Sequence, residues 1–206
     1  MDAAGLMRHG AQMAFLRLIA ISLCLLAAPI GVAAQGDNTL NYTLDAEESD
    51  VSARVRFFGI SSKTARFPRM EGAVTIVPGA PQDAMIDVTF DAIAIEASDE
   101  TTRRRLRGER FFWVERYPTI RFVGRSLDLE TPTSGTVTGE LTARGVTNTE
   151  TLEVTFTSDP QTALPGTAVD FTGKMEIDRR NYGMRSYQLV VGNKVKIELN
   201  ARMVPN

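Results

Sequence analysis

In residues 193–204, NKVKIELNARMV, polar and apolar side chains alternate from Lys194 to Met203. Because successive side chains of a β-strand point to opposite faces, this pattern predicts a strand with one face buried and the other in water. One-sided burial is typical of antiparallel sheets, whereas strands of parallel sheets are apolar on both faces. The C-terminal stretch therefore predicts an antiparallel β protein.

The same period of two recurs upstream in nearly every segment after residue 38. It predicts about nine strands, separated by Gly and Pro, at residues 38–44, 50–59, 70–77, 84–96, 119–129, 135–144, 150–158, 167–177 and 193–204. The apolar positions change phase near Asp91–Ala92 and near Gly124, which indicates a bulge or bend in each strand. Such a meander favours an all-β, closed antiparallel barrel, since closure removes sheet edges; a two-sheet sandwich is the alternative.

Residues 98–107, SDETTRRRLR, interrupt the alternation. Cap-type and acidic residues come first and arginines last, which predicts one short helical insertion near residues 99–113. The arginines could hold an anionic head group or touch a membrane surface, or they could form a solvated helix face. The aromatic residues that follow could line the mouth of a cavity or plug one end of the barrel: Phe111, Phe112, Trp113 and Tyr117.

Residues 1–34 have the three parts of a secretory signal peptide. Arg8 and Arg17 give a basic start, residues 18–28 (LIAISLCLLAA) form an apolar run, and small residues end at Ala34. The run is too short to span a bilayer comfortably, although a membrane anchor is the alternative. We therefore expect cleavage after Ala34 and a periplasmic or secreted bacterial protein, whether translation starts at Met1, Met7 or Met13.

Cleavage would remove His9 and Cys24, the only histidine and the only cysteine of the chain. The remaining chain would lack the residues of Ser-His-Asp and Cys-His sites and the commonest metal ligands. We therefore expect a protein that is not an enzyme and has neither a catalytic cofactor nor a metal; the alternative is a paired-carboxylate site, for which the acidic residues at strand ends and loops are Asp45, Glu47, Glu48, Asp128 and Glu130. The net charge of −2 gives no electrostatic support for a nucleic-acid partner.

Four ordered blocks of sequence resemble a known family. They are residues 101–123 (TTRRRLRGERFFWVERYPTIRFV), 139–147 (GELTARGVT), 177–184 (IDRRNYGM) and 191–195 (VGNKV). Together they resemble the YceI family of exported, lipocalin-like, polyisoprenoid-binding proteins over about residues 38–204. Relatives usually have an Arg-Asp pair and then a His before the Leu-Arg, at the positions of Thr102, Arg103 and Arg105 here.

The resemblance implies a barrel that holds a polyisoprenoid lipid or the tail of an isoprenoid quinone. One alternation face then supplies the candidate lining: Phe57, Val88, Phe90, Phe122, Leu141, Phe156, Phe171, Met175 and Leu199. Candidates for the mouth or a plug are Phe67, Phe111, Phe112 and Tyr182, and candidates for head-group contacts are Arg103, Arg105 and Arg107. We expect a monomer or homodimer with at most transient membrane contact. The alternative is a solid-core β module that acts through protein contacts in a stress response.

Overall fold

The computed structural model describes residues 39–206. The predicted signal peptide, with His9 and Cys24, lies outside the described residues. No helix in the described part of the chain is long and apolar enough to cross a bilayer.

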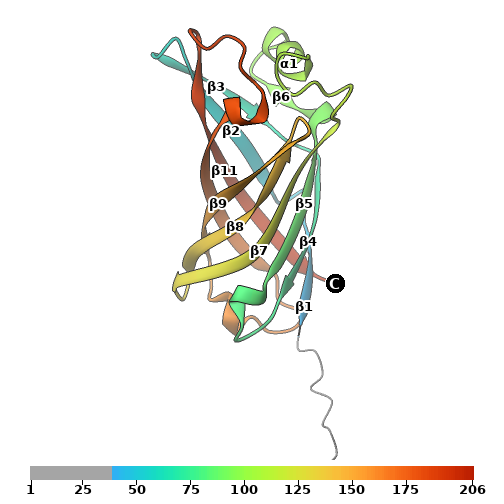
Figure 1. The fold of residues 1–206 in the computed structure, drawn as a ribbon. Coiled ribbons are helices and arrows are strands. Elements are labelled where there is room, and N and C mark those ends of the chain that lie inside the picture. Colours follow the sequence, from blue (N-terminus) through green and yellow to red (C-terminus); the bar gives the residue numbers. More distant parts are fainter. Residues whose placement is uncertain (1–38) are drawn as a thin grey trace, which may run out of the picture. The chain divides into compact units, whose positions relative to one another are not determined.

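Eight antiparallel strands form a closed ring, because the first and the last strand of the chain pair with each other (Figure 1). In ring order they are β1 (Leu40–Leu44), β4 (Met70–Ile76), β5 (Met85–Asp91), β7 (Thr119–Thr131), β8 (Ser134–Ala143), β9 (Val146–Phe156), β10 (Val169–Asp178) and β11 (Val191–Pro205). This confirms the predicted antiparallel barrel and excludes the sandwich. The ring and its core are formed by residues 39–206.

Three further strands extend the wall: β2 (Asp50–Phe57), β3 (Ser61–Arg66) and β6 (Glu96–Ala97). The long strand β11 makes this possible, since its last residues pair with β1 and residues 191–200 pair with β2. The nine predicted strands are all present, but β3 and β6 were not predicted. Strand β3 (SSKTAR) is mostly polar, and β6 has only two residues, so neither carries a clear period of two.

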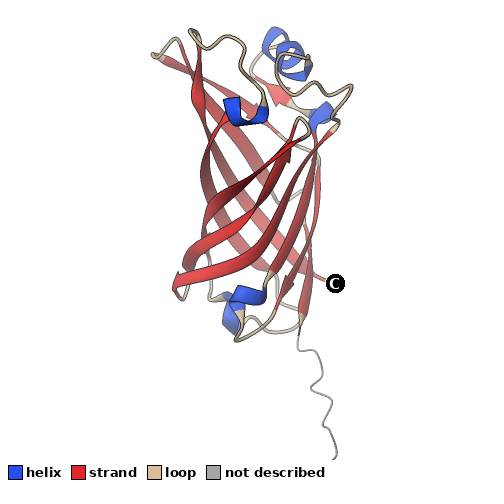
Figure 2. Cartoon of the chain, in the orientation of Figure 1, coloured by secondary structure: helices blue, strands red, loops and turns tan. Residues whose placement is uncertain are grey.

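Helical segments gather at the two ends of the barrel (Figure 2). One end carries the helix α1 (Glu100–Arg107) with the 3₁₀ turns η2 (Ala92–Ala94) and η4 (Arg179–Tyr182), and we call it the mouth end. The opposite end carries η1 (Pro81–Asp83) and η3 (Pro160–Thr162). The predicted helix is confirmed as α1, but it ends at Arg107, and residues 108–112 form turns.

The side chain of Asp99 caps α1 and accepts a hydrogen bond from the backbone N–H of Thr102 at 2.8 Å. Asp99 also pairs with Lys63 of β3 at 3.0 Å, which ties the helix to the barrel wall. The hydrogen bonds from Thr102 and Lys63 hold the pKa of the Asp99 carboxyl well below its usual range.

The two predicted changes of phase have different structural causes. The register of β7 against β8 shifts between Gly124 and Ser126, which confirms a bulge near Gly124. Near Asp91 the change of phase marks a bend rather than a bulge, because β5 ends there and the chain turns into η2. The Asp91 carboxylate accepts a hydrogen bond from the N–H of Ile93 at 2.8 Å and starts η2.

Inward-facing apolar side chains are packed unequally around the barrel. On β7, β8 and β9 they are fully buried, as for Phe122, Leu141 and Val154. On β2, β10 and β11 the corresponding side chains are only half-buried, although they point inward: Ala53, Val55, Met175, Val195, Ile197 and Leu199. Since these side chains face the interior, the space that leaves them uncovered lies inside the barrel.

Candidate functional site

A large apolar cavity occupies the barrel interior. It leaves about 1480 Å³ between its lining side chains, including the part that is open to solvent. The lining comes from strands all around the ring and from α1, and its polar members are only Lys63, Thr64, Thr102 and Arg179. These four belong to β3, α1 and η4, all at the mouth end. A hollow that is apolar in its body and polar at its mouth suits an apolar ligand with a polar end.

The opposite end of the barrel is filled by packed side chains. Buried residues there that do not line the cavity include Tyr42, Ile76, Leu127, Val169 and Met203. The cavity is therefore an apolar space closed at one end of the barrel.

Within residues 39–206, no group of three or more His, Cys, Asp or Glu side chains could hold a metal ion.

Most of the predicted ligand-binding residues meet in this cavity. The lining includes Phe67, Val88, Phe90, Phe111, Phe112, Phe122, Leu141, Phe171, Met175 and Leu199. Period-two alternation put the strand residues of this set on one face, and barrel closure turns that face inward. Their contact with a ligand stays a prediction.

Phe57 and Phe156, both predicted as lining residues, lie outside the lining. Phe57 ends β2 beside the turn, where its ring meets Phe58 edge-on at 4.7 Å and lies 5.8 Å from the ammonium of Lys63. Phe156 is buried near the opposite end, with its ring 5.6 Å from that of Phe171. Both occupy positions of the alternation that face inward, as predicted. Phe57, however, lies at the mouth end of the cavity and Phe156 beyond its opposite end, since each is the last residue of its strand.

Tyr182, a predicted mouth residue, is also absent from the lining. Its side chain is fully buried, and its hydroxyl donates a hydrogen bond to Glu150 of β9 at 2.7 Å. Burial and the neighbouring carboxylate raise the pKa of the Tyr182 hydroxyl well above its usual value. Tyr182 thus packs η4 against β9.

The three arginines predicted for head-group contacts do not line the cavity. Helix α1 turns Thr102 and Leu106 toward the interior instead, because residues four apart share one helix face. Arg103 pairs with Glu100 on the helix surface. Arg105 lies in a separate shallow recess at the mouth end, which it lines together with Gly108, Glu109, Arg110, Phe111 and Tyr187.

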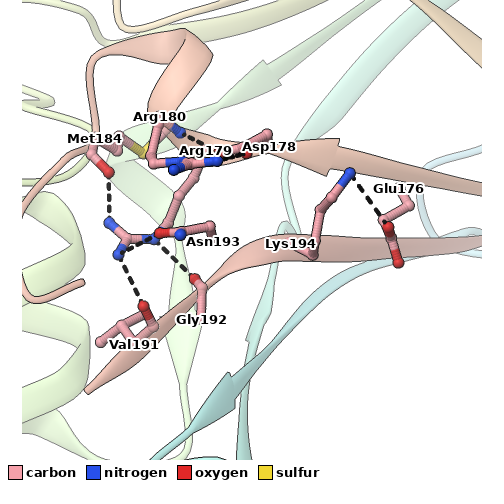
Figure 3. Close-up of polar contacts among 9 residues, drawn as sticks. All are labelled: Glu176, Asp178, Arg179, Arg180, Met184, Val191, Gly192, Asn193 and Lys194. Carbon is pink, nitrogen blue, oxygen red and sulfur yellow. Dashed lines mark hydrogen bonds and ion pairs between the residues drawn. The ribbon is translucent and has the colours of Figure 1, made fainter. Parts of the chain in front are cut away.

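The sequence analysis did not predict a role for Arg179, although this residue is the only buried charged side chain in the described part of the chain. Its guanidinium donates to the backbone carbonyls of Gly192 (2.9 Å), Val191 (2.9 Å) and Met184 (Figure 3). A fourth carbonyl, that of Ser186, accepts from it at 2.8 Å. Burial lowers the pKa of Arg179. The side chain therefore holds the loop of residues 183–190 to the end of the barrel.

The period-two alternation of β10 could have identified Arg179 as an inward-facing charged residue. Ile177 faces inward and Asp178 outward, so the next position is inward, and a charged residue there is unusual. Asp178 itself binds Arg180, whose hydrogen bonds lower the pKa of the Asp178 carboxyl to about 2.

Two segments cover the mouth, residues 108–118 after α1 and the loop 183–190. They meet where the rings of Phe111 and Tyr187 stack at 6.0 Å and Arg110 donates to the Tyr187 hydroxyl at 2.7 Å. Arg144 also joins them from the β8–β9 turn. Its guanidinium donates to the carbonyls of Gly183 (2.9 Å) and Glu109 (3.0 Å).

We expect Arg144→Asn to loosen this cover without disturbing the turn that carries it. Arg144 and Gly145 both have positive φ, 51° and 72°, as a two-residue type I′ hairpin turn requires, and Asn-Gly is a preferred pair there. Only the guanidinium contacts are lost, including the one 5.9 Å from the Trp113 ring. Denaturant unfolding should show a loss of about 1–2 kcal/mol, and the emission of Trp113, the only tryptophan, should shift. Arg125→Asn on the outer wall is the control, and equal behaviour of the two variants would contradict this role.

Comparison with known proteins agrees with this architecture. The family model described as "YceI-like domain" matches residues 42–203. The UPF0312 protein SAS2572 of Staphylococcus aureus is 26% identical over 170 residues, which cover 78% of this chain and 95% of that protein. A UPF0312 protein of Shewanella denitrificans is 21% identical over 164 residues, covering 79% and 86%.

Two solved structures share the fold. BcnA of Burkholderia cenocepacia has a TM-score of 0.68 and 23% identity, covering 77% of this chain and 98% of that one. A structure described as a polyisoprenoid binding domain from Saccharophagus degradans has a TM-score of 0.60 and 15% identity, covering 81% and 99%. The family match spans nearly all of the barrel and agrees with the four sequence blocks, so the chain belongs to the YceI-like domain family.

Proposed function

We propose that this protein binds a long-chain polyisoprenoid lipid, or the tail of an isoprenoid quinone, inside its barrel. The observation that carries the proposal is the apolar cavity enclosed by a closed ring of strands, with polar lining residues only at the mouth end. The Saccharophagus degradans structure, described as a polyisoprenoid binding domain, has the same fold and supports the proposal.

The shape of the cavity suits a chain better than a compact ligand. On β11 the lining runs from Val191 to Ala201, and its regular part from Val195 to Ala201 alone extends about 20 Å along the strand at ~3.3 Å per residue. An apolar chain gains roughly 0.8 kcal/mol per buried methylene, so one isoprene unit contributes about 3–4 kcal/mol before entropy is subtracted. Binding of this kind needs no catalytic group.

A polar head group would lie at the mouth. Of the predicted head-group residues, Arg105 is the best placed, because it shares the recess beside Phe111 with Arg110 and Tyr187. A phosphate or a quinone carbonyl there would accept hydrogen bonds from guanidinium groups. We keep Arg103 and Arg107 as weaker candidates, since Arg103 already pairs with Glu100.

The cellular role that fits this chemistry is transport, storage or protection of the lipid under stress. It would take place in the periplasm or outside the cell, after removal of residues 1–34, with the protein as a monomer or homodimer. The cavity counts against the alternative of a solid β module, because that alternative requires a filled core.

Mass spectrometry tests the proposal directly. Residues 35–206, purified and extracted with organic solvent, should release an isoprenoid lipid, and native spectra should show the chain mass plus one lipid. Delipidated protein should take up one added polyprenyl lipid in preference to a saturated fatty acid of equal length. A bare chain that takes up no polyprenyl lipid would contradict the proposal.

A further inference from the structure

The three most exposed apolar side chains of the mouth end lie on two neighbouring segments. Phe58 and Ile60, in the β2–β3 turn, are 62% and 93% exposed, and Leu189, in the loop 183–190, is 99% exposed. The two segments adjoin, because the N–H of Phe58 donates to the carbonyl of Val190 at 2.7 Å. Isolated exposed apolar residues are ordinary, but a cluster at the entrance of an apolar cavity marks an interaction surface.

Charge is distributed unevenly between the two ends of the barrel. At the mouth end, the segments 56–63, 92–118, 144–145 and 178–194 hold thirteen Arg and Lys residues against six Asp and Glu residues. At the opposite end, residues 77–84, 128–134 and 157–168 hold four acidic residues and no basic one. The chain as a whole carries −2, so the positive mouth is a local feature.

Several of the mouth-end cations have no carboxylate partner. Arg56 and Arg185 are exposed and belong to the same segments as the apolar tips. Within residues 39–206 neither has a carboxylate oxygen within 4.0 Å, and the same holds for Arg104 and Arg105. Exposed apolar tips flanked by free arginines are the composition that binds the interface of an anionic membrane.

We propose that the mouth end docks on an anionic lipid bilayer, with Phe58, Ile60 and Leu189 inserted among the head groups and the arginines on lipid phosphates. This rests on the proposed function and names the surface from which the lipid is collected or to which it is delivered. In this orientation the cavity opens toward the acyl region, and the acidic end points away from the membrane. A long apolar tail could then pass into the barrel with little exposure to water.

A second copy of the chain is a poorer occupant of this surface. A symmetric dimer through the mouths would place two positively charged ends against each other, whereas an anionic bilayer complements them. The sequence also provides a matched comparison, since Leu164 at the opposite end is 70% exposed but has no basic residue in its segment.

The test is co-sedimentation of residues 35–206 with vesicles, because residues 18–28 could bind vesicles by themselves. We expect binding to vesicles of phosphatidylglycerol and phosphatidylethanolamine that weakens as salt is raised. Ile60→Ser with Leu189→Ser should weaken it about tenfold or more. Arg56→Glu with Arg185→Glu should weaken it about tenfold on these vesicles and have no effect on phosphatidylcholine vesicles.

Leu164→Ser and Arg125→Glu are the controls and should bind vesicles like the parent. The proposal is overturned if the parent does not bind anionic vesicles, or if Leu164→Ser weakens binding as much as the tip variant does. It is also overturned if sedimentation shows a dimer that Ile60→Ser with Leu189→Ser converts to a monomer.

Titration with a soluble short-chain quinone, without vesicles, separates the docking proposal from the proposed function. The double variants at Ile60 and Leu189 and at Arg56 and Arg185 should bind the quinone with the parent affinity. Failure of the parent to bind the quinone would count against cavity binding alone.

Discussion

Ile197→Trp is expected to weaken isoprenoid binding about a hundredfold and to leave the barrel folded. Ile197 lies on β11 between Met175 of β10 and Ala53 of β2, and its side chain is half-buried because it faces the cavity. An indole at this position would extend into free space rather than into packed side chains. Losing room for one isoprene unit removes about 3–4 kcal/mol of apolar burial, which is at least two orders of magnitude in affinity.

The matched control is Lys196→Trp, one residue away on the same strand. Its side chain points outward and is exposed, so the same indole would leave the cavity unchanged. Native mass spectrometry with an added polyprenyl lipid measures binding, and a thermal melt measures stability. The melting temperature of Ile197→Trp should equal or exceed that of the parent, since the indole buries apolar surface that was in contact with solvent. Parent-like affinity in Ile197→Trp would mean that the ligand does not occupy this part of the barrel.

The fold was largely predictable because the sequence of each long strand alternates apolar and polar residues, which indicates that one face is buried. Strand β11 shows this best, since its alternation holds through the residues that pair with three different strands. Strand β3 was missed because Ser61, Ser62 and Lys63 give no apolar alternation, and pairing with β2 determines its conformation instead. The closing pair of β1 with β11 joins the two ends of the domain, and no local pattern reports such a contact.

The hollow interior could not be predicted from the strands themselves. Inward parity is the same for Val154, which is packed in the core, and for Leu199, which lines free space. What differs is the volume opposite each side chain, and that depends on the whole ring. The arginines of α1 show a related limit. They lie close in sequence to the aromatic residues 111–117, which suggested a shared site at the mouth. In the helix, however, Thr102 and Leu106 face the cavity and the arginines do not.

Arg179→Met is expected to cost about 3–5 kcal/mol of stability, as loss of a buried, fully hydrogen-bonded charge usually does. Methionine is similar in length but has no donor, so the carbonyls of Met184, Ser186, Val191 and Gly192 would lose their shared partner. Arg179→Lys should lose nearly as much, because an ammonium group cannot reproduce the planar fork of the guanidinium. Denaturant unfolding measures both variants.

Arg180→Met is the control, since Arg180 is the next residue and its ion pair with Asp178 lies at the surface. Surface pairs contribute about 0–1 kcal/mol, so this variant should stay close to the parent. If Arg179→Met costs no more than Arg180→Met, the carbonyl contacts do not hold the loop. Otherwise hydrogen exchange should rise most in residues 183–190, which carry Tyr187 against Phe111 and Leu189 into solvent. A buried arginine would then connect the barrel wall to the mouth, and loosening it should speed lipid exchange even at temperatures where the barrel stays folded.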